Sequence, residues 1–313
     1  STTHVIKWLN FLNKKWFRIN KLLEFEIDYS IKINASKNNS VLKKEGCSVA
    51  LGDITSVWYR RRQKPLGIPL RDTFDAATKS KININIHTEE QALFYGLTRL
   101  LDDKKWLSHP DNSNLNKLYQ LDIATKLGLT IPDTILTSNK DFLLKFRAEH
   151  KDIIIKNIRD LRPVLDKNTY YIPYVKTIED SFLDQLPSQF FPTLVQKCIK
   201  KQFELRVFFI GGKIFSMAMF SQEDSQTAED FRRYNNQRPT RRVRYQLPQE
   251  LEDKIGLFMK EVGLNTGSLD FIYSDQDEYI FLEVNPVGQF GMVSHPCNYN
   301  LNKEIALYLS EKQ

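Results

Sequence analysis

Gly267-Ser268-Leu269-Asp270-Phe271-Ile272-Tyr273 and Tyr279-Ile280-Phe281-Leu282-Glu283-Val284-Asn285-Pro286 are two runs rich in β-branched and aromatic residues near the C-terminus. The polar segment 274–278 separates them, and this pattern predicts a β-hairpin. Because successive side chains of a strand point to opposite faces, Glu283 and Asn285 should share one face with Phe281. Leu282 and Val284 should then point the other way, into a core.

Asp270 lies on the first strand of this predicted hairpin and Glu283 and Asn285 on the second. Two carboxylates and an amide oxygen that converge from paired strands form an all-oxygen site. Such a site suits Mg²⁺, especially Mg²⁺ that takes further ligands from the phosphates of a nucleotide. The alternative is an edge hairpin whose acids are simply solvated.

The composition is that of a globular protein. The chain has 313 residues, 41% hydrophobic and 27% charged, which is enough for two or three domains. It contains no apolar run of about eighteen residues and no signal-peptide pattern, so nothing predicts a membrane span or secretion. The three cysteines are widely spaced and the five histidines lack metal-ligand spacing. We therefore expect reduced thiols and a cytoplasmic location.

The net charge of +7 is unevenly distributed. Residues 231–249 contain six arginines and no acid, and a smaller basic cluster lies at 60–64. Such patches suit phosphates, nucleic acid or an acidic peptide, or they are solvated loops. No zinc finger, RNP aromatic signature or helix-turn-helix pattern is present, so nucleic acid is not an expected partner.

Helical and strand patterns alternate irregularly along the rest of the chain, which predicts an α+β protein with several antiparallel sheets. We expect a helix over 88–101 with Thr88 as its N-cap, and a domain boundary in the polar segment 108–114.

The short apolar run Ile153-Ile154-Ile155 carries Lys156, which is costly to bury without an anion such as phosphate. A strand-end lysine that reaches solvent is the alternative. Strands are expected over 193–199 and 203–210, with Gly211-Gly212 as the following turn. Neither a P-loop nor a GxGxxG motif occurs.

Several segments resemble one enzyme family. The set of Asp270, Glu283 and Asn285, with Lys156 and the segment 196–206 upstream, resembles ATP-grasp ligases. More narrowly, the chain resembles graspetide (microviridin-type) peptide maturases in these segments: Trp58-Tyr59-Arg60-Arg61, Asn116-Lys117 through Ile131-Pro132-Asp133-Thr134, Asp230-Phe231-Arg232, and Phe281-Leu282-Glu283-Val284-Asn285-Pro286-Val287-Gly288-Gln289-Phe290. The segment 291–299 is similar to the grasp-with-spasm branch of that group.

The resemblance implies an ATP-grasp fold with an N-terminal pre-ATP-grasp domain (1–107), a central domain (108–192) and a C-terminal antiparallel-sheet domain (193–313). It implies an enzyme that uses ATP and Mg²⁺ to close macrocycles in a ribosomally made precursor peptide with an acidic core. Side chains of Asp or Glu in the precursor would be phosphorylated, then joined to Ser or Thr hydroxyls as ω-esters or to Lys as ω-amides. The precursor's leader would dock on the irregular segment 158–190, and a homodimer is expected.

The resemblance also implies roles for individual residues. Asp270, Glu283 and Asn285 would hold Mg²⁺, and Lys117 and Lys156 would contact the ATP phosphates. The adenine hinge would consist of Gln196, Lys197 and Ile199, with Glu204 at the ribose. Arg206 and Arg232 would steady the transferring phosphoryl group and the acyl phosphate, because a planar and always-charged donor suits that role.

Two features depart from the family pattern. No glycine occurs between Gly128 and Gly211, so a glycine-rich lid over the phosphates is missing from this sequence. Some relatives carry an arginine two residues before the metal aspartate, where this chain has Ser268. The acyl-phosphate role then falls on Arg206 or Arg232, although Arg232 has an alternative role as an ion-pair partner of Asp230.

Two other functions remain open at this point. One is an ATP-grasp ligase that joins a free amino acid or amine to a carboxylate, which would act without any leader-bearing peptide. The other is a basic, non-enzymatic nucleic-acid-binding protein, whose binding would depend on salt and on the arginines but not on Asp270 or Glu283.

Overall fold

The computed structural model describes residues 2–20, 27–33, 36–60, 73–159, 164–166, 169–171, 176–223 and 239–311. The chain forms two compact units. The first consists of residues 1–111 and 301–313, and the second of residues 112–300. The boundary at 111–112 lies within the polar segment 108–114.

The first unit combines helices from both ends of the chain with short strands. Helix α1 (Thr2–Phe11) packs against α9 (Leu301–Ser310), and Val5 of α1 is fully buried. The strands β1 (Ile27–Ser30), β2 (Val41–Lys44) and β3 (Cys47–Ala50) form an antiparallel sheet, and β4 (Ser56–Trp58) pairs in parallel with β5 (Lys105–Leu107). The short 3₁₀ helices η1 (Lys37–Asn39) and η2 (Leu51–Asp53) connect them.

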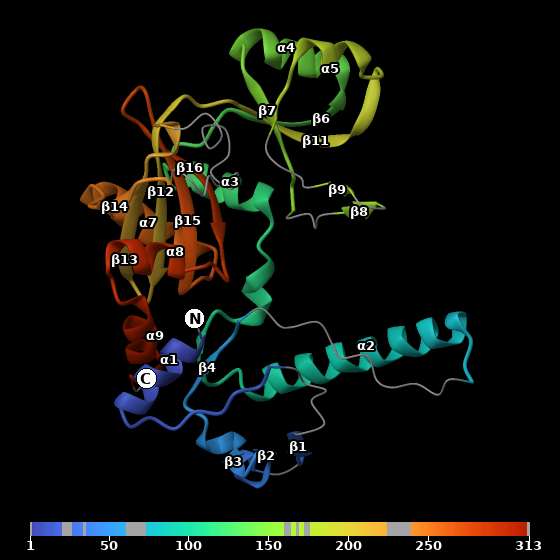
Figure 1. Cartoon of the computed structure of the whole chain (residues 1–313), viewed down its shortest axis with the longest axis vertical. Coiled ribbons are helices and arrows are strands. Elements are labelled where there is room, and N and C mark those ends of the chain that lie inside the picture. The colour runs from blue at the N-terminus through green and yellow to red at the C-terminus, as the bar shows by residue number, and fades with distance from the viewer. Residues whose placement is uncertain are drawn as a thin grey trace. The chain divides into compact units, whose positions relative to one another are not determined.

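The long helix α2 (Ala76–Leu100), drawn in cyan to green in Figure 1, extends away from the strands of this unit. Its N-cap is Asp75, whose carboxylate accepts a hydrogen bond from the backbone N–H of Thr78 at 2.6 Å. The predicted start at Thr88 is therefore wrong, because Thr88 lies inside the helix and its hydroxyl donates to the Ile84 carbonyl at 3.0 Å. Among the described helices, none is both long enough and apolar enough to cross a membrane.

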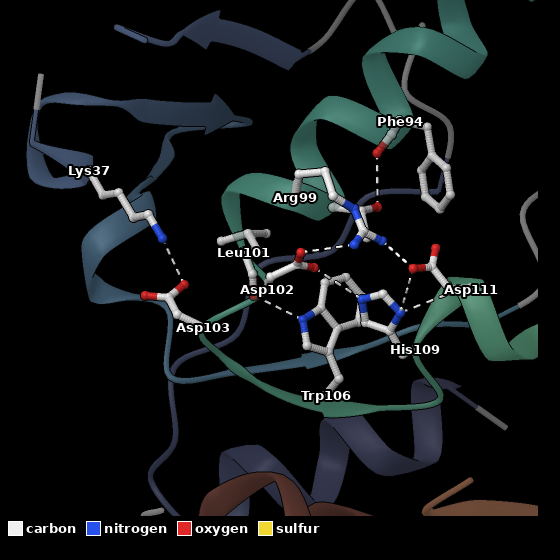
Figure 2. A network of polar contacts seen from close by, with 10 residues as sticks. Lys37, Phe94, Arg99, Leu101, Asp102, Asp103, Trp106, His109 and Asp111 are labelled. Atoms are coloured by element: carbon white, nitrogen blue, oxygen red, sulfur yellow. Dashed lines mark hydrogen bonds and ion pairs between the residues drawn. The ribbon is translucent and has the colours of Figure 1, made fainter. Parts of the chain in front are cut away.

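A polar network fixes the C-terminal end of α2 to residues 102–111, which directly precede the boundary with the second unit (Figure 2). Arg99 forms ion pairs with Asp102, at 3.0 Å, and with Asp111. His109 lies between the same two acids, with its Nε2 3.2 Å from Asp102, and its ring contacts Trp106 edge-on. These contacts hold the beginning of the 3₁₀ helix η3 (Pro110–Asn114) against the end of α2.

The second unit contains a central sheet with the strand order β10-β7-β11-β6. Its strands are β6 (Thr134–Asn139), β7 (Ile153–Lys156), β10 (Lys176–Thr177) and β11 (Gln189–Lys197), and β8 (Val164–Asp166) pairs separately with β9 (Thr169–Tyr171). Helices α4 (Lys140–His150) and α5 (Asp180–Gln185) lie on one face of the sheet (Figure 1). Leu143, Phe146, Ile153, Leu183 and Val195 form the buried core between them.

A larger antiparallel sheet follows, with the strand order β14-β13-β12-β15-β16. Its strands are β12 (Lys201–Ile210), β13 (Lys213–Met219), β14 (Arg242–Tyr245), β15 (Thr266–Ser274) and β16 (Tyr279–Asn285). The β12–β13 turn is Gly211-Gly212, as predicted. Both glycines have positive φ (53° and 87°), which side chains rarely tolerate.

Helices cover both faces of this C-terminal sheet. The main core lies between one face and the helices α3 (Lys117–Lys126) and α7 (Gln249–Glu261), where Leu205, Phe258 and Phe271 are fully buried. On the other face, α8 (Gly291–Cys297) packs against β12, β13 and β14. The 3₁₀ helix η4 (Ser221–Glu223) follows β13.

The predicted hairpin is confirmed as β15 and β16, but one detail of its faces is wrong. The pairing shifts register, so that Asp270 opposes Glu283 whereas Phe271 opposes Phe281. Leu282 is thus an extra residue that forms a β-bulge. As a result Phe281 belongs to the core with Val284, not to the face of Glu283, and Leu282 is only half-buried.

Candidate functional site

The centre of the candidate site lies on the sheet face that is opposite to the main core. Asp270 of β15 faces Glu283 of β16 across the pairing, and Asn285 faces Ser268 two pairs further on, which is the next pair on the same face. The amide Nδ2 of Asn285 lies 3.4 Å from a carboxylate oxygen of each acid. The hairpin therefore brings together all three predicted metal ligands.

This set contains two carboxylates and one amide. In the part of the chain that the structure describes, no group of three or more His, Cys, Asp or Glu side chains has the geometry of a metal site. Two carboxylates with an amide oxygen suit a hard cation that takes its remaining ligands from water or phosphate.

Each carboxylate has a cationic partner from another element. Lys117, the first residue of α3, places its Nζ 2.8 Å from Glu283, and Arg206 of β12 forms an ion pair with both oxygens of Asp270. Arg206 and Asp270 are direct partners in the β12–β15 pairing. Lys117 is held at the start of α3 by Asn116, whose side chain caps the helix by accepting from the backbone N–H groups of Leu118 and Tyr119.

The two acids differ in their electrostatics. Burial raises the pKa of Asp270 to about 6, against the opposing charge of Arg206 and with a further increase from Glu283. Burial also raises the pKa of Glu283, but the positive charges of Lys117 and Lys156 outweigh it, and the net shift is downward. Lys156, at the end of β7, contributes its positive charge to this lowered pKa of Glu283.

The predicted adenine hinge lies where β11 leaves the central sheet. Gln196 is 1% exposed, and its Nε2 donates a hydrogen bond to the Thr134 hydroxyl at 2.9 Å. Its Oε1 is buried and has no hydrogen-bond partner among the described residues. The backbone N–H of Lys197 donates to the Asp133 carbonyl at 2.9 Å, and Ile199 follows as a half-buried residue outside the strand.

Lys201 is a mostly buried lysine that no sequence pattern marks. It forms an ion pair with Glu204, the predicted ribose ligand, and both side chains are about 10% exposed. Glu204 lies on the same face of β12 as Arg206, two residues away. The sequence signal for Lys201 was weak, since Lys200-Lys201 reads as a solvated basic pair after the hinge.

Gln120 of α3 is a second residue that the sequence did not reveal. It is 3% exposed, and its Oε1 accepts a hydrogen bond from the backbone N–H of Val284 at 2.8 Å. This contact holds the bulged strand β16 against α3, and with it the position of Glu283 relative to Lys117. A glutamine inside an amphipathic helix gives no sequence signal for such a role.

The arginines of the basic segment 231–249 divide into those that the structure describes and those that lie outside the described residues. Arg232, like Arg233 and Arg238, lies outside the described residues, as does Asp230. Arg244 donates hydrogen bonds to the carbonyls of Cys297 and Asn298 at the end of α8, and its guanidinium lies 4.8 Å from the Tyr299 ring centroid. Arg244 therefore stabilises the C-terminal end of α8.

Comparisons with known proteins agree with this fold. The family "MvdD pre-ATP grasp domain" matches residues 1–114. No curated protein matches the chain. Macrocyclase MdnC from Microcystis aeruginosa MRC, solved with precursor peptide MdnA, is 26% identical with a TM-score of 0.80, over 98% of this chain and 94% of that chain.

Two further structures share the fold at lower identity. The RiPP-associated ATP-grasp ligase of Chryseobacterium gregarium, in complex with ADP and a leader and core peptide, is 23% identical with a TM-score of 0.84, over 99% of this chain and 91% of that chain. The ATP-grasp ligase PsnB, complexed with minimal precursor, Mg and ADP, is 16% identical with a TM-score of 0.73, over 98% of this chain and 92% of that chain. The pre-ATP-grasp domain match and the likeness over nearly the whole chain show an ATP-dependent ligase with the ATP-grasp fold, similar to the peptide macrocyclase and the peptide ligases named above.

Proposed function

We propose that this enzyme closes macrocycles in a ribosomally made precursor peptide that has an acidic core. The observation that carries the proposal is the pairing of Asp270 with Glu283, beside Asn285, in a site that also holds Lys117 and Arg206. The chain that carries this site is similar over 98% of its length to a peptide macrocyclase.

The reaction proceeds in two steps, a phosphoryl transfer and an acyl transfer. A side-chain carboxylate of the precursor attacks the γ-phosphorus of ATP, the bond to the β-phosphate oxygen breaks, and ADP leaves. The resulting acyl phosphate is attacked at carbon by a Ser or Thr hydroxyl, or by a Lys amine, which loses its proton as inorganic phosphate departs. The product is an ω-ester or an ω-amide. Phosphorylation is needed because a free carboxylate is a poor acyl donor.

The residues present fit ATP and Mg²⁺. The buried and unpartnered Oε1 of Gln196 is an acceptor that matches the amino group of adenine, which is a donor. Asp270, Glu283 and Asn285 supply oxygen ligands for Mg²⁺. When bound there, the metal neutralises the charge of the β- and γ-phosphates that would otherwise repel the incoming carboxylate.

The chain's own residues have distinct roles in binding ATP. Lys117 and Lys156 bind phosphate oxygens, and Glu204 accepts hydrogen bonds from the ribose hydroxyls. Arg206 steadies the transferring phosphoryl group, as does Arg232, which lies outside the described residues. Lys197 and Ile199 present their backbone edges to adenine.

The proposal extends to partners. The precursor's leader docks on the segment 158–190, of which 160–163, 167–168 and 172–175 lie outside the described residues. The basic segment that begins at 232 suits an acidic core peptide. We further propose that the enzyme acts in the cytoplasm as a homodimer of the grasp-with-spasm branch.

The test is mass spectrometry of an acidic precursor peptide after incubation with the enzyme, ATP and Mg²⁺. We expect successive losses of one water mass per ring in the wild type and none with Glu283→Gln. Glu278→Gln is the matched control, because Glu278 is an exposed acid in the turn of the same hairpin and should leave ring formation intact. A mass gain equal to an added amino acid would instead indicate a ligase for small amines. If no precursor peptide causes the release of ADP, the proposal that this protein is a peptide macrocyclase is contradicted.

A further inference from the structure

We propose that Lys117 is the resident counter-ion of the metal site, and that it couples metal binding to nucleotide binding. Without nucleotide it pairs with Glu283 and lowers the affinity of the site for a free divalent cation. The phosphates of a nucleotide take over Lys117 and free Glu283 for the metal. This inference rests on the proposed function, since it concerns how the same ATP site is loaded.

The charges of the site are balanced within the chain. Glu283 pairs with Lys117 at 2.8 Å, and Asp270 pairs with Arg206. The side chains of Lys117 and Glu283 are 15% and 27% exposed, and those of Arg206 and Asp270 are 9% and 15% exposed. Water therefore screens both ion pairs only weakly. The charge of Lys156 also acts on Glu283. A divalent cation that arrives alone therefore meets two carboxylates that are already neutralised.

Of the two cations, Lys117 is the one that can exchange its carboxylate partner for another anion. Arg206 lies on the central strand β12, is 9% exposed and contacts both oxygens of Asp270, so its removal would leave a buried carboxylate unpaired. Lys117 contacts Glu283 and the Asn157 carbonyl, at 3.2 Å, through one flexible side chain. It can therefore change partners by a rotation of its own side chain.

The position of Lys117 on α3 adds a second reason. It is the first residue of a ten-residue helix, and the positive end of the helix dipole disfavours a cation there. An anion beside Lys117 compensates for this, and Glu283 supplies that anion in the structure. A phosphate group would satisfy both the lysine and the helix end better than Glu283 does, because phosphate brings more charge and more acceptor oxygens.

The experiment is a calorimetric titration of Mn²⁺ into the protein, without nucleotide and with saturating ADP. In the wild type we expect ADP to tighten Mn²⁺ binding by about tenfold or more, and Mn²⁺ to tighten ADP binding by the same factor, as linkage requires. In Lys117→Gln we expect nucleotide-free Mn²⁺ binding to tighten by about tenfold and the effect of ADP to shrink.

Lys126→Gln is the matched control. Lys126 lies in the last turn of the same helix, pairs with Asp122 at 2.7 Å and is 65% exposed. Its loss should leave Mn²⁺ binding unchanged. The tighter binding in Lys117→Gln should disappear when Glu283→Gln is added, which assigns the ion to this site and not to another.

The outcomes separate the inference from the proposed function. If the wild type binds ADP but Mn²⁺ affinity is the same with and without ADP, the coupling is absent and the inference is wrong. Unchanged nucleotide-free Mn²⁺ affinity in a folded Lys117→Gln protein would also overturn it, while the proposed function would stand. If the wild type binds no adenine nucleotide at all, the proposed function itself fails.

Discussion

Gly288 lies so close to Ser268 that a Cβ at position 288 would be 2.8 Å from the backbone nitrogen of Ser268. Ser268 is fully buried on β15 and faces Asn285 in the pairing with β16. The requirement for glycine after the hairpin is therefore one of space. The chain that leaves β16 packs directly on the strand that carries Asp270, and this fixes the end of the proposed metal site.

Gly288→Ala should therefore destabilise the protein and distort the proposed metal site. The added methyl group would meet the Oγ and Cβ of the fully buried Ser268 as well as its backbone nitrogen, and overpacking of this kind costs about 1–3 kcal/mol. Urea unfolding and the Mn²⁺ affinity in the presence of ADP would measure the two effects. Gly256→Ala is the control, since no atom lies within 4 Å of its added Cβ and the position is inside helix α7. That change should stabilise the protein by roughly 0.5–1 kcal/mol. Equal behaviour of the two variants would contradict the close approach.

Arg206→Met should lower the free energy of unfolding by about 3 kcal/mol or more, because it leaves the mostly buried Asp270 carboxylate unpaired. Asp270→Asn should partly restore stability in the Arg206→Met background, since a neutral amide needs no counter-ion. A double-mutant cycle by urea unfolding would give the coupling. The exposed pair of Lys254 and Glu250 in α7, at 2.8 Å, is the control, and Lys254→Met should leave the unfolding midpoint unchanged. Additive effects of the Arg206 and Asp270 variants would show that the two residues do not form a stabilising pair.

Gln196→Leu should reduce the preference for ATP over GTP. In the proposed site, the buried Oε1 of Gln196 would accept from an adenine amino group but would face an acceptor oxygen in guanine. We expect ATP affinity to fall by about tenfold, which is about 1.4 kcal/mol, and GTP affinity to change little. Nucleotide displacement assays would measure both. Thr134→Val, which removes only the hydroxyl that holds the Gln196 amide, should have the same effect in weaker form. A parallel loss of ATP and GTP affinity would mean that Gln196 acts on the fold and not on the base.

Part of this site was predictable because its signals are local. The alternating pattern and the polar turn of residues 267–286 are enough to place Asp270 and Glu283 on paired strands, and the structure confirms that hairpin. The turn at Gly211-Gly212 was equally clear, since two adjacent glycines permit two positive φ angles. The α+β fold and the ATP-grasp assignment are confirmed as well.

The rest depends on contacts between distant residues. The bulge at Leu282 reverses the expected place of Phe281, which packs with Val284 into the same core. Arg206 and Asp270 lie 64 residues apart, so their pairing follows from the register of β12 and β15, which no local pattern encodes. The start of α2 was misplaced for a simpler reason. Thr88 resembles an N-cap in sequence, yet the residues before it continue the helix back to Asp75.

The two candidate caps of α2 give a direct test of where this helix begins. Asp75→Ala should destabilise α2, whereas Thr88→Ala should be neutral or slightly stabilising, because alanine is the better residue inside a helix. The backbone N–H of Thr78 lowers the pKa of Asp75 from its ordinary value of 3.8. A lowered pKa in the folded state means that the stabilising effect is present above pH 3.8 and is lost as the pH falls below it.

Hydrogen exchange of the first α2 amides, followed from neutral pH to below pH 3.8, would measure this effect. The difference between the wild type and Asp75→Ala should be largest at neutral pH and should shrink as Asp75 takes up a proton. Asp75→Asn keeps a cap without a titrating group, so its protection should depend less on pH. If Thr88→Ala weakened protection and Asp75→Ala did not, the helix would begin at Thr88, and the first turns of α2 would not be helical.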